Sequence, residues 1–91
     1  SLYIDLKYIN LLAGRLPLFK RKDDYLFNCR CVICGDSQTH KNKARGYFYR
    51  KDNDMFYRCH KCNYGTNIAK FLEQIDPLLY KEYVMEKFVK K

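Results

Sequence analysis

Three patterns in this sequence together predict an α+β fold. Two Cys-x-x-Cys pairs are separated by 24 residues, and four cysteines so arranged can surround one metal ion. Aromatic residues alternate along the middle of the chain, as in strands, whereas apolar residues recur at spacings of three and four on both sides, as in helices. We therefore predict a small zinc ribbon: a three-stranded antiparallel sheet with a zinc site of four cysteines, flanked by one N-terminal and two C-terminal helices. At 91 residues the chain is expected to form a single domain, residues 1–91, whose small core needs the metal.

The N-terminal helix is predicted over residues 2–14. Its apolar residues form one stripe, made of Leu2, Leu6, Ile9, Ala13 and Leu16. Gly14 and Pro17 are typical of the end of a helix. The stripe indicates that this helix packs against the rest of the domain.

The zinc ribbon is predicted over residues 24–65. Its three strands are expected at residues 25–30, 46–50 and 55–59. A three-residue turn at 52–54 would place Tyr49 opposite Tyr57 and Arg50 opposite Phe56. One face of the sheet, expected to be core, would then carry Tyr25, Phe27, Tyr47, Tyr49, Met55 and Tyr57. The opposite face would carry Arg30, Phe48, Arg50, Phe56, Arg58 and His60.

The second of these faces combines aromatic rings with cations. Phe48 and Phe56 can stack on unpaired bases, and Arg50 and Arg58 can neutralise phosphates, so this face is predicted to bind single-stranded nucleic acid. Alternatively, both phenylalanines pack beneath the flanking helices while the arginines extend outward. A shift of the strand pairing by one residue would exchange the two faces.

The loop between the cysteine pairs is polar and basic. Its residues Lys43 and Arg45 are predicted to contact phosphates, although any solvated loop of this composition would look similar. The loop belongs to residues 20–61, which carry 11 positive and 5 negative charges in a chain of net charge +8. Such a charge favours a polyanionic partner, nucleic acid above all, and argues against an acidic electron-transfer protein.

Two helices are predicted after the ribbon, over residues 66–76 and 77–90. Thr66 is expected to cap the first, whose apolar stripe comprises Ile68, Phe71, Leu72 and Ile75. Asp76 and Pro77 fit the N-cap and the first position of the second helix. Near the end of this helix, Lys87, Lys90 and Lys91 are expected to lie on a solvent-exposed face, where they suit the helix dipole.

The predicted metal ligands are Cys31, Cys34, Cys59 and Cys62. Zinc is the expected ion, and iron in a rubredoxin-like site is the alternative. Four protein thiolates leave no open coordination position, so we expect a structural zinc and no catalytic residue in this chain. Cys29 is expected to be a buried free thiol, and a histidine, His40 or His60, would be a ligand only if it replaced a cysteine.

The chain carries no pattern typical of membrane insertion or secretion. Its apolar runs are far shorter than the roughly 18 to 20 residues of a spanning helix, and no secretory leader is recognisable. Five cysteines, an odd number, without a leader favour a reducing compartment. We therefore expect no membrane partner and no secretion.

Three segments of the middle region share a distinctive combination of residues. They are residues 31–37 (CVICGDS, ending in Ser37), 43–47 (KARGY) and 59–64 (CHKCNY). Together they closely resemble the N-terminal zinc-binding domain of replicative DNA primases from large tailed phages. The end of that family's N-terminal helix is similar to Leu12, Ala13, Leu16, Pro17 and Phe19. The chain is more distantly similar to the zinc ribbon of bacterial primases, but it has cysteine where that group usually has histidine as the second ligand.

The resemblance implies a role in DNA replication. In such primases the zinc domain helps to select the initiation site on single-stranded DNA template, assists primer synthesis and holds the RNA primer for handover. Catalysis and its Mg²⁺ lie in a separate TOPRIM-containing domain, whose acidic motifs are absent here. The implied partners are template, primer, the catalytic primase domain and the replicative helicase, with polymerase or single-strand-binding protein as further candidates. The implied location is the cytoplasm of the host bacterium.

A second class of function stays open, that of a transcription-type zinc ribbon acting mainly in protein–protein interaction. Its contacts would come from the terminal helix and from Tyr64, Tyr80 and Tyr83. This interpretation predicts weak, sequence-indifferent DNA binding, whereas the primase interpretation predicts a preference for single strands over duplex.

Overall fold

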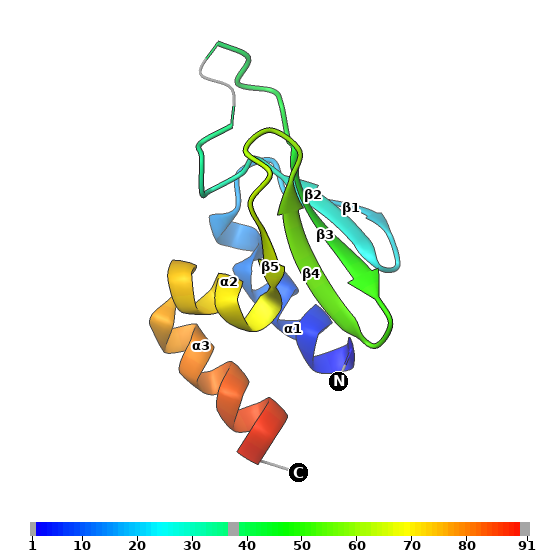
Figure 1. Ribbon diagram of the computed structural model, residues 1–91, viewed down its shortest axis with the longest axis vertical. Helices are drawn as coiled ribbons and strands as arrows, with labels where there is room; N and C mark the ends of the chain where they lie inside the picture. The colour runs from blue at the N-terminus through cyan, green and yellow to red at the C-terminus, as the bar shows by residue number, and fades with distance from the viewer. Residues whose placement is uncertain (1, 37–38, 90–91) are drawn as a thin grey trace.

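The computed structural model describes residues 2–36 and 39–89 (Figure 1). The first half of the chain forms α1 (Leu2–Leu12), the 3-10 turn η1 (Ala13–Arg15), β1 (Lys20–Asp23) and β2 (Leu26–Cys29). The second half forms β3 (Gly46–Lys51), β4 (Asp54–Cys59), β5 (Gly65–Asn67), α2 (Ile68–Ile75), α3 (Pro77–Val84) and the π-helical turn η2 (Met85–Val89). The predictions for Ser37, Lys90 and Lys91 lie outside the described residues.

All five strands belong to one antiparallel sheet, in the order β1-β2-β3-β4-β5. The predicted α+β class is confirmed, but the prediction of three strands is wrong, because β1 and β5 add one strand at each edge. β1 has the sequence Lys-Arg-Lys-Asp and is exposed throughout, so it has no apolar alternation by which to recognise a strand. β5 has only three residues and pairs with β4.

The turn between β3 and β4 is tighter than predicted. The pairs across this hairpin include Lys51 with Asp54, Arg50 with Met55, Tyr49 with Phe56, and Phe48 with Tyr57. The loop therefore contains only Asp52 and Asn53, and Asp52 adopts a positive φ of 58°, which aspartate tolerates better than most residues. The predicted three-residue turn is wrong by one residue, and that difference exchanges the two faces of β3.

The helices lie against one face of the sheet (Figure 1), where Phe48, Met55 and Tyr57 are fully buried. The Phe48 ring contacts Phe71 of α2, with centroids 5.2 Å apart. The prediction that Phe48 lies on the exposed face is therefore wrong, and its packing beneath the helices, the stated alternative, is confirmed. Tyr25, expected in the core, is 39% exposed in the turn before β2.

Side-chain caps mark the starts of the C-terminal helices. Asn67, rather than Thr66, caps α2, because Asn67 Oδ1 accepts a hydrogen bond from the Lys70 amide at 2.8 Å. Asp76 caps α3 as predicted, accepting from the Leu79 amide at 3.1 Å, and the proline that follows occupies the first turn. No helix among the described residues is both long and apolar enough to cross a membrane.

A buried carboxylate joins α1 to β4 and to the C-terminal helix. Asp5 is 1% exposed and accepts hydrogen bonds from the Met55 amide at 2.9 Å, the Tyr83 hydroxyl at 2.7 Å and Lys87 Nζ at 2.9 Å. Burial alone would lower the pKa of Lys87, but the hydrogen bonds to Tyr83 and Asp5 raise it above its usual value. The prediction that Lys87 is merely solvated is wrong, because its side chain is 13% exposed and is paired with Asp5. Asp5 lies 82 residues away in the sequence, so no local pattern identifies this pair.

Candidate functional site

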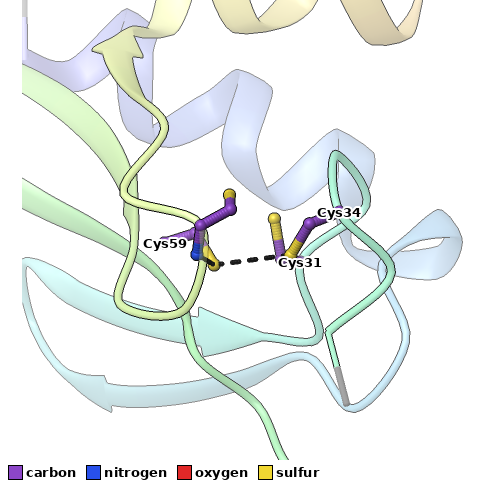
Figure 2. Close-up of side chains that lie close together, drawn as sticks. Cys31, Cys34 and Cys59 are labelled. Carbon is purple, nitrogen blue, oxygen red and sulfur yellow. Dashed lines mark hydrogen bonds between the residues drawn. The ribbon is translucent and has the colours of Figure 1, made fainter. Parts of the chain in front are cut away.

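Four cysteine thiols gather at one end of the sheet. The sulfur atoms of Cys31, Cys34, Cys59 and Cys62 all lie within 4.8 Å of one another, so one metal ion can contact all four. Figure 2 shows Cys31, Cys34 and Cys59 close together, and the Sγ atoms of Cys34 and Cys59 are 3.8 Å apart. The structure thus brings together the four residues that the spacing predicted as ligands.

Each cysteine pair forms a tight turn of the same kind. The amide of Gly35 donates to the Cys31 carbonyl at 3.0 Å, and the amide of Asn63 donates to the Cys59 carbonyl at 2.9 Å. Gly35 and Asn63 both have a positive φ, 77° and 62°, a conformation that glycine adopts freely and asparagine tolerates. These residue types therefore allow both turns to close in the same way.

Backbone amides donate to the cysteine sulfurs. The Asp36 amide reaches Cys34 Sγ at 3.4 Å, and the amides of Lys61 and Cys62 reach Cys59 Sγ at 3.3 and 3.4 Å. Such donors stabilise a thiolate, which is the form that binds metal. Burial would raise the pKa of Cys34, but the Asp36 amide and the neighbouring cysteines hold it below its usual value.

This donor set fits a metal ion bound through sulfur. Four clustered thiols suit zinc, or alternatively iron, and the amide donors are typical of the surroundings of metal-bound thiolates. All four ligands would come from the protein, which leaves no position for substrate or water on a tetrahedral ion. An ion bound here would hold the two cysteine turns together.

A buried carboxylate connects the first cysteine turn to the loop that follows it. Asp36 is fully buried, and its Oδ2 accepts from the Arg45 amide at 2.9 Å and the Cys31 amide at 3.4 Å. Its Oδ1 lies 3.4 Å from Arg45 Nε. Its backbone carbonyl accepts from Lys61 Nζ of the second turn at 3.2 Å. Arg45, predicted as a phosphate contact, thus pairs with Asp36 while its side chain keeps 36% exposure.

Arg30 holds the loop between the two cysteine pairs. Its guanidinium donates to the carbonyls of Gly35 at 2.9 Å, His40 at 3.1 Å and Lys43 at 3.2 Å. Arg30 is therefore half-buried against the loop instead of standing on the cationic face where it was expected. Arg30 thus holds the described part of the loop at Gly35, His40 and Lys43, and Lys43 itself is exposed.

The remaining cysteine and the two histidines lie outside the thiol cluster. Cys29 is fully buried, as expected, and burial raises its pKa to about 12, so the neutral thiol is favoured. His60 is exposed, and its ring packs edge-on against Tyr47 with centroids 4.9 Å apart. His40 Nδ1 lies 3.0 Å from the Thr39 hydroxyl. Neither histidine belongs to the group of four ligands.

The sheet face opposite the helices carries aromatic and cationic side chains in a row. Tyr49 pairs with Phe56, and their rings are stacked with centroids 6.1 Å apart and an interplanar angle of 27°. The next pair is Tyr47 with Arg58, and Tyr47 also contacts His60. The three rings Tyr47, Tyr49 and Phe56 are half-exposed, and Arg58 and His60 are exposed. We call these five residues the open face.

Four of the six residues predicted to contact nucleic acid lie on or beside the open face. Phe56 and Arg58 are part of it. Lys43 and Arg45 belong to the adjoining loop, whose Arg45 carbonyl accepts a hydrogen bond from the His60 amide at 2.9 Å. Cationic and aromatic groups are thus continuous from the sheet to the cysteine turns.

The other two predicted residues are elsewhere. Phe48 is buried in the core. Arg50 pairs with Met55, so it lies on the covered side of the sheet, at the end remote from the thiols. Its guanidinium packs 4.7 Å from the centroid of the Tyr25 ring. Both displacements follow from the tighter turn, which shifts β3 by one residue against β4.

Two parts of this surface differ from the prediction. Tyr47 and Tyr49, predicted in the core, lie on the open face because the tighter turn shifts the register of β3. Lys20 and Lys22 of β1, to which the sequence pattern assigned no role, line a hollow of about 410 Å³ together with Asn28, the neighbour of Tyr47 in β2. The charge of the run at 20–22 was a usable signal, although no periodicity identified it as a strand.

The chain is similar to the DNA primase of Enterobacteria phage T4, with 36% identity over 87 residues. The match covers 92% of this chain and 25% of that primase, so the chain spans about a quarter of the length of its curated relative. No protein-family model matches the chain. The similarity relates nearly all of this domain to one portion of a phage primase.

Proposed function

We propose that this chain is the zinc-binding domain of a DNA primase, which binds single-stranded DNA template, helps to select the initiation site and holds the RNA primer for handover. The observation that carries the proposal is the similarity to a phage primase along nearly the whole chain. The thiol cluster supports it, and zinc is the proposed ion because it prefers four thiolates in tetrahedral geometry. The domain would contribute binding and positioning. Catalysis, with its Mg²⁺, would belong to a part of the primase outside this chain.

The open face supports the binding of unpaired bases. Tyr47, Tyr49 and Phe56 offer half-exposed rings, and stacking of a base on such a ring contributes about 1–3 kcal/mol. Arg58 stands beside these rings and can neutralise a phosphate. Lys43 and Arg45 of the loop, and Lys20 and Lys22 of β1, extend the positive charge on either side.

Other proteins of replication are the proposed partners. The catalytic domain of the same primase and the replicative helicase come first, with polymerase or single-strand-binding protein as further candidates. A domain of this kind would work where phage DNA is copied, in the cytoplasm of the host bacterium.

The test is a titration of the zinc-loaded domain with labelled single-stranded, duplex and RNA–DNA hybrid oligonucleotides over a range of salt concentrations. We expect a preference for single strands or primed template. Tyr49→Ala should weaken binding by about tenfold, in line with the loss of one stacked base. Arg58→Ala should weaken binding to all sequences and reduce the salt slope by about 1.

Arg50→Ala is the matched control, because Arg50 is an exposed arginine of the same sheet on its other side. It is expected to leave both affinity and salt slope unchanged. Equal, weak binding to all three nucleic acids, unaffected by Tyr49→Ala and Arg58→Ala, would exclude nucleic-acid binding by the open face.

A role in protein–protein interaction is the second candidate, because apolar side chains are exposed on the C-terminal helices. They are Leu78, Met85, Phe88 and Val89, at 73%, 52%, 59% and 61% exposure. Of the tyrosines predicted for such contacts, Tyr64 and Tyr80 are half-buried, but Tyr83 is buried against Asp5, so that prediction is wrong for Tyr83. Leu78→Ser should then abolish copurification with a replication protein while nucleic-acid binding is retained.

A further inference from the structure

The hydroxyl of Tyr57 is an unpaired polar group in the core. The Tyr57 side chain is fully buried, and its Oη has no hydrogen-bond partner among the described residues. Leaving a buried hydroxyl unpaired is unfavourable, because the group loses its hydrogen bonds to water on burial. Native proteins rarely retain such a group without a partner such as a bound water or ion. The position of this hydroxyl indicates what that partner is.

The Tyr57 hydroxyl lies at the thiol end of the sheet. It reaches over Gly46, where a Cβ atom would stand only 2.4 Å from Oη. Gly46 is paired with Cys59 of β4 on one side and with Cys29 of β2 on the other. The absence of a side chain at Gly46 thus gives the phenol room beside the cysteine cluster.

Tyr57 and Cys59 are two residues apart in β4, so their side chains lie on the same face of the sheet. Cys31 and Cys59 are the two fully buried ligands, and they belong with Tyr57 to one core cluster. The Cys59 sulfur already accepts from two amides, so the Cys31 sulfur is the acceptor better suited to the hydroxyl. An O–H group of this kind is a suitable donor to a metal-bound sulfur.

We propose that Tyr57 is a positioning residue of the metal site, whose hydroxyl donates a hydrogen bond to the Cys31 sulfur when that sulfur binds the ion. The proposal rests on the metal-binding part of the proposed function and is independent of nucleic-acid binding. Peptide amides already donate to the sulfurs of Cys34 and Cys59 from the two turns. Tyr57 adds a donor from strand β4. When Cys31 binds the metal, its sulfur would accept the hydrogen bond that the Tyr57 hydroxyl otherwise lacks. Outer donors of this type orient the ligand and tune the ion.

The experiment compares Tyr57→Phe with the unaltered full chain. Zinc affinity is measured by competition with a chelator, and the Co²⁺-substituted protein is measured by absorption spectroscopy. We expect zinc affinity to fall by about tenfold, the lower limit for loss of an outer hydrogen bond. The sulfur-to-cobalt charge-transfer band should shift, while the visible bands of tetrahedral Co²⁺ stay in place. If the hydroxyl were unpaired in the metal-bound protein, its removal would instead leave affinity unchanged or increase it.

Tyr83→Phe is the matched control. Tyr83 is also buried, but its hydroxyl donates to Asp5 at 2.7 Å, in the network that joins α1 to the C-terminal helix. This variant should lose thermal stability and keep the Co²⁺ spectrum of the unaltered protein. An unchanged spectrum in Tyr57→Phe would overturn the proposal for Tyr57 alone. Failure of the unaltered chain to bind Zn²⁺ or Co²⁺ would overturn the proposed metal site as well.

Discussion

The two faces of the sheet are built from similar residues and differ in what covers them. On the covered face, Phe48 and Tyr57 pack beneath α1 and α2 with no exposure. On the open face, Tyr47, Tyr49 and Phe56 are half-exposed beside Arg58 and His60. Strand β3 alone places three aromatic residues in succession, at 47, 48 and 49. Hydrophobicity therefore does not decide which of them is inside.

The turn decides between the faces. A loop of two residues pairs Phe48 with the buried Tyr57, whereas a loop of three would have paired Tyr49 with it. The covered face then packs against the helices, and the rings of the open face stay half-exposed. Four experiments test this contrast.

Removal of the metal should have the largest effect, because it affects both faces. The binding of structural zinc contributes on the order of 10–16 kcal/mol to the folding of small zinc domains. Here the ion would link the cysteine turn that follows β2 to the cysteine turn at the end of β4. Excess chelator should abolish the near-ultraviolet circular dichroism of the buried tyrosines and the cooperative thermal transition. Added Zn²⁺ should restore both, whereas a cooperative transition that persists without metal would contradict the prediction.

Truncation of one ring on each face compares the two faces directly. Phe48→Ala should lower the free energy of unfolding by about 3–5 kcal/mol, because it leaves a cavity against Phe71. Tyr49→Ala should lower it by less than about 1 kcal/mol, because the ring is half-exposed. Urea denaturation of the zinc-loaded proteins measures both values. Equal losses would mean that the open face is also part of the core.

A methyl group at Gly46 tests the thiol end of the covered face. Gly46→Ala should cost about 1–3 kcal/mol, because its Cβ would meet Tyr57 Oη at 2.4 Å. In a Tyr57→Phe background the cost should fall but not vanish, since Cε1 and Cζ of the ring would still lie 3.0 Å from that Cβ. A double-mutant cycle of unfolding free energies measures the coupling. Additive effects would show that the ring moves aside freely.

Alkaline pH tests the opposite end of the covered face and should have the smallest effect near neutrality. The folded protein raises the pKa of Lys87, so its ion pair with Asp5 contributes fully below 10.5, the usual lysine value, and is lost as pH rises through the folded value. Burial, together with Glu86, raises the pKa of Tyr8 to about 12. The neutral Tyr8 phenol therefore stabilises the folded state fully below pH 10, the usual tyrosine value, and this contribution is lost as pH rises from 10 toward 12. Burial also raises the pKa of Cys29 to about 12, from a usual value of 9.0, so unfolding free energy should be nearly constant near neutrality and fall as pH rises above about 9.

Lys87→Met separates the lysine from the other two groups. This substitution keeps much of the side-chain volume and removes the charge, so the decline above pH 10 should become shallower. Urea titrations at a series of pH values measure it. An identical pH dependence in the variant would exclude a contribution from the Asp5–Lys87 pair.

Local patterns in the sequence determined several features of this protein. Two Cys-x-x-Cys pairs followed by Gly35 and Asn63 identified both turns, because those residue types tolerate the required positive φ. Apolar spacing identified the helices, and Asp76 followed by proline identified the start of α3. Each of these signals lies within a few residues of the structure that it forms.

Only the tertiary structure decided the rest, because the deciding interactions join distant residues. The faces of β3 depend on a one-residue difference in a turn and on which rings the helices cover. The basic strand β1 exists only because β2 is there to pair with it. Two partners of Asp5, Tyr83 and Lys87, are 78 and 82 residues away in the sequence. The sequence by itself specified the metal turns and the helices, whereas the packing of helices on the sheet specified which aromatic rings remain exposed.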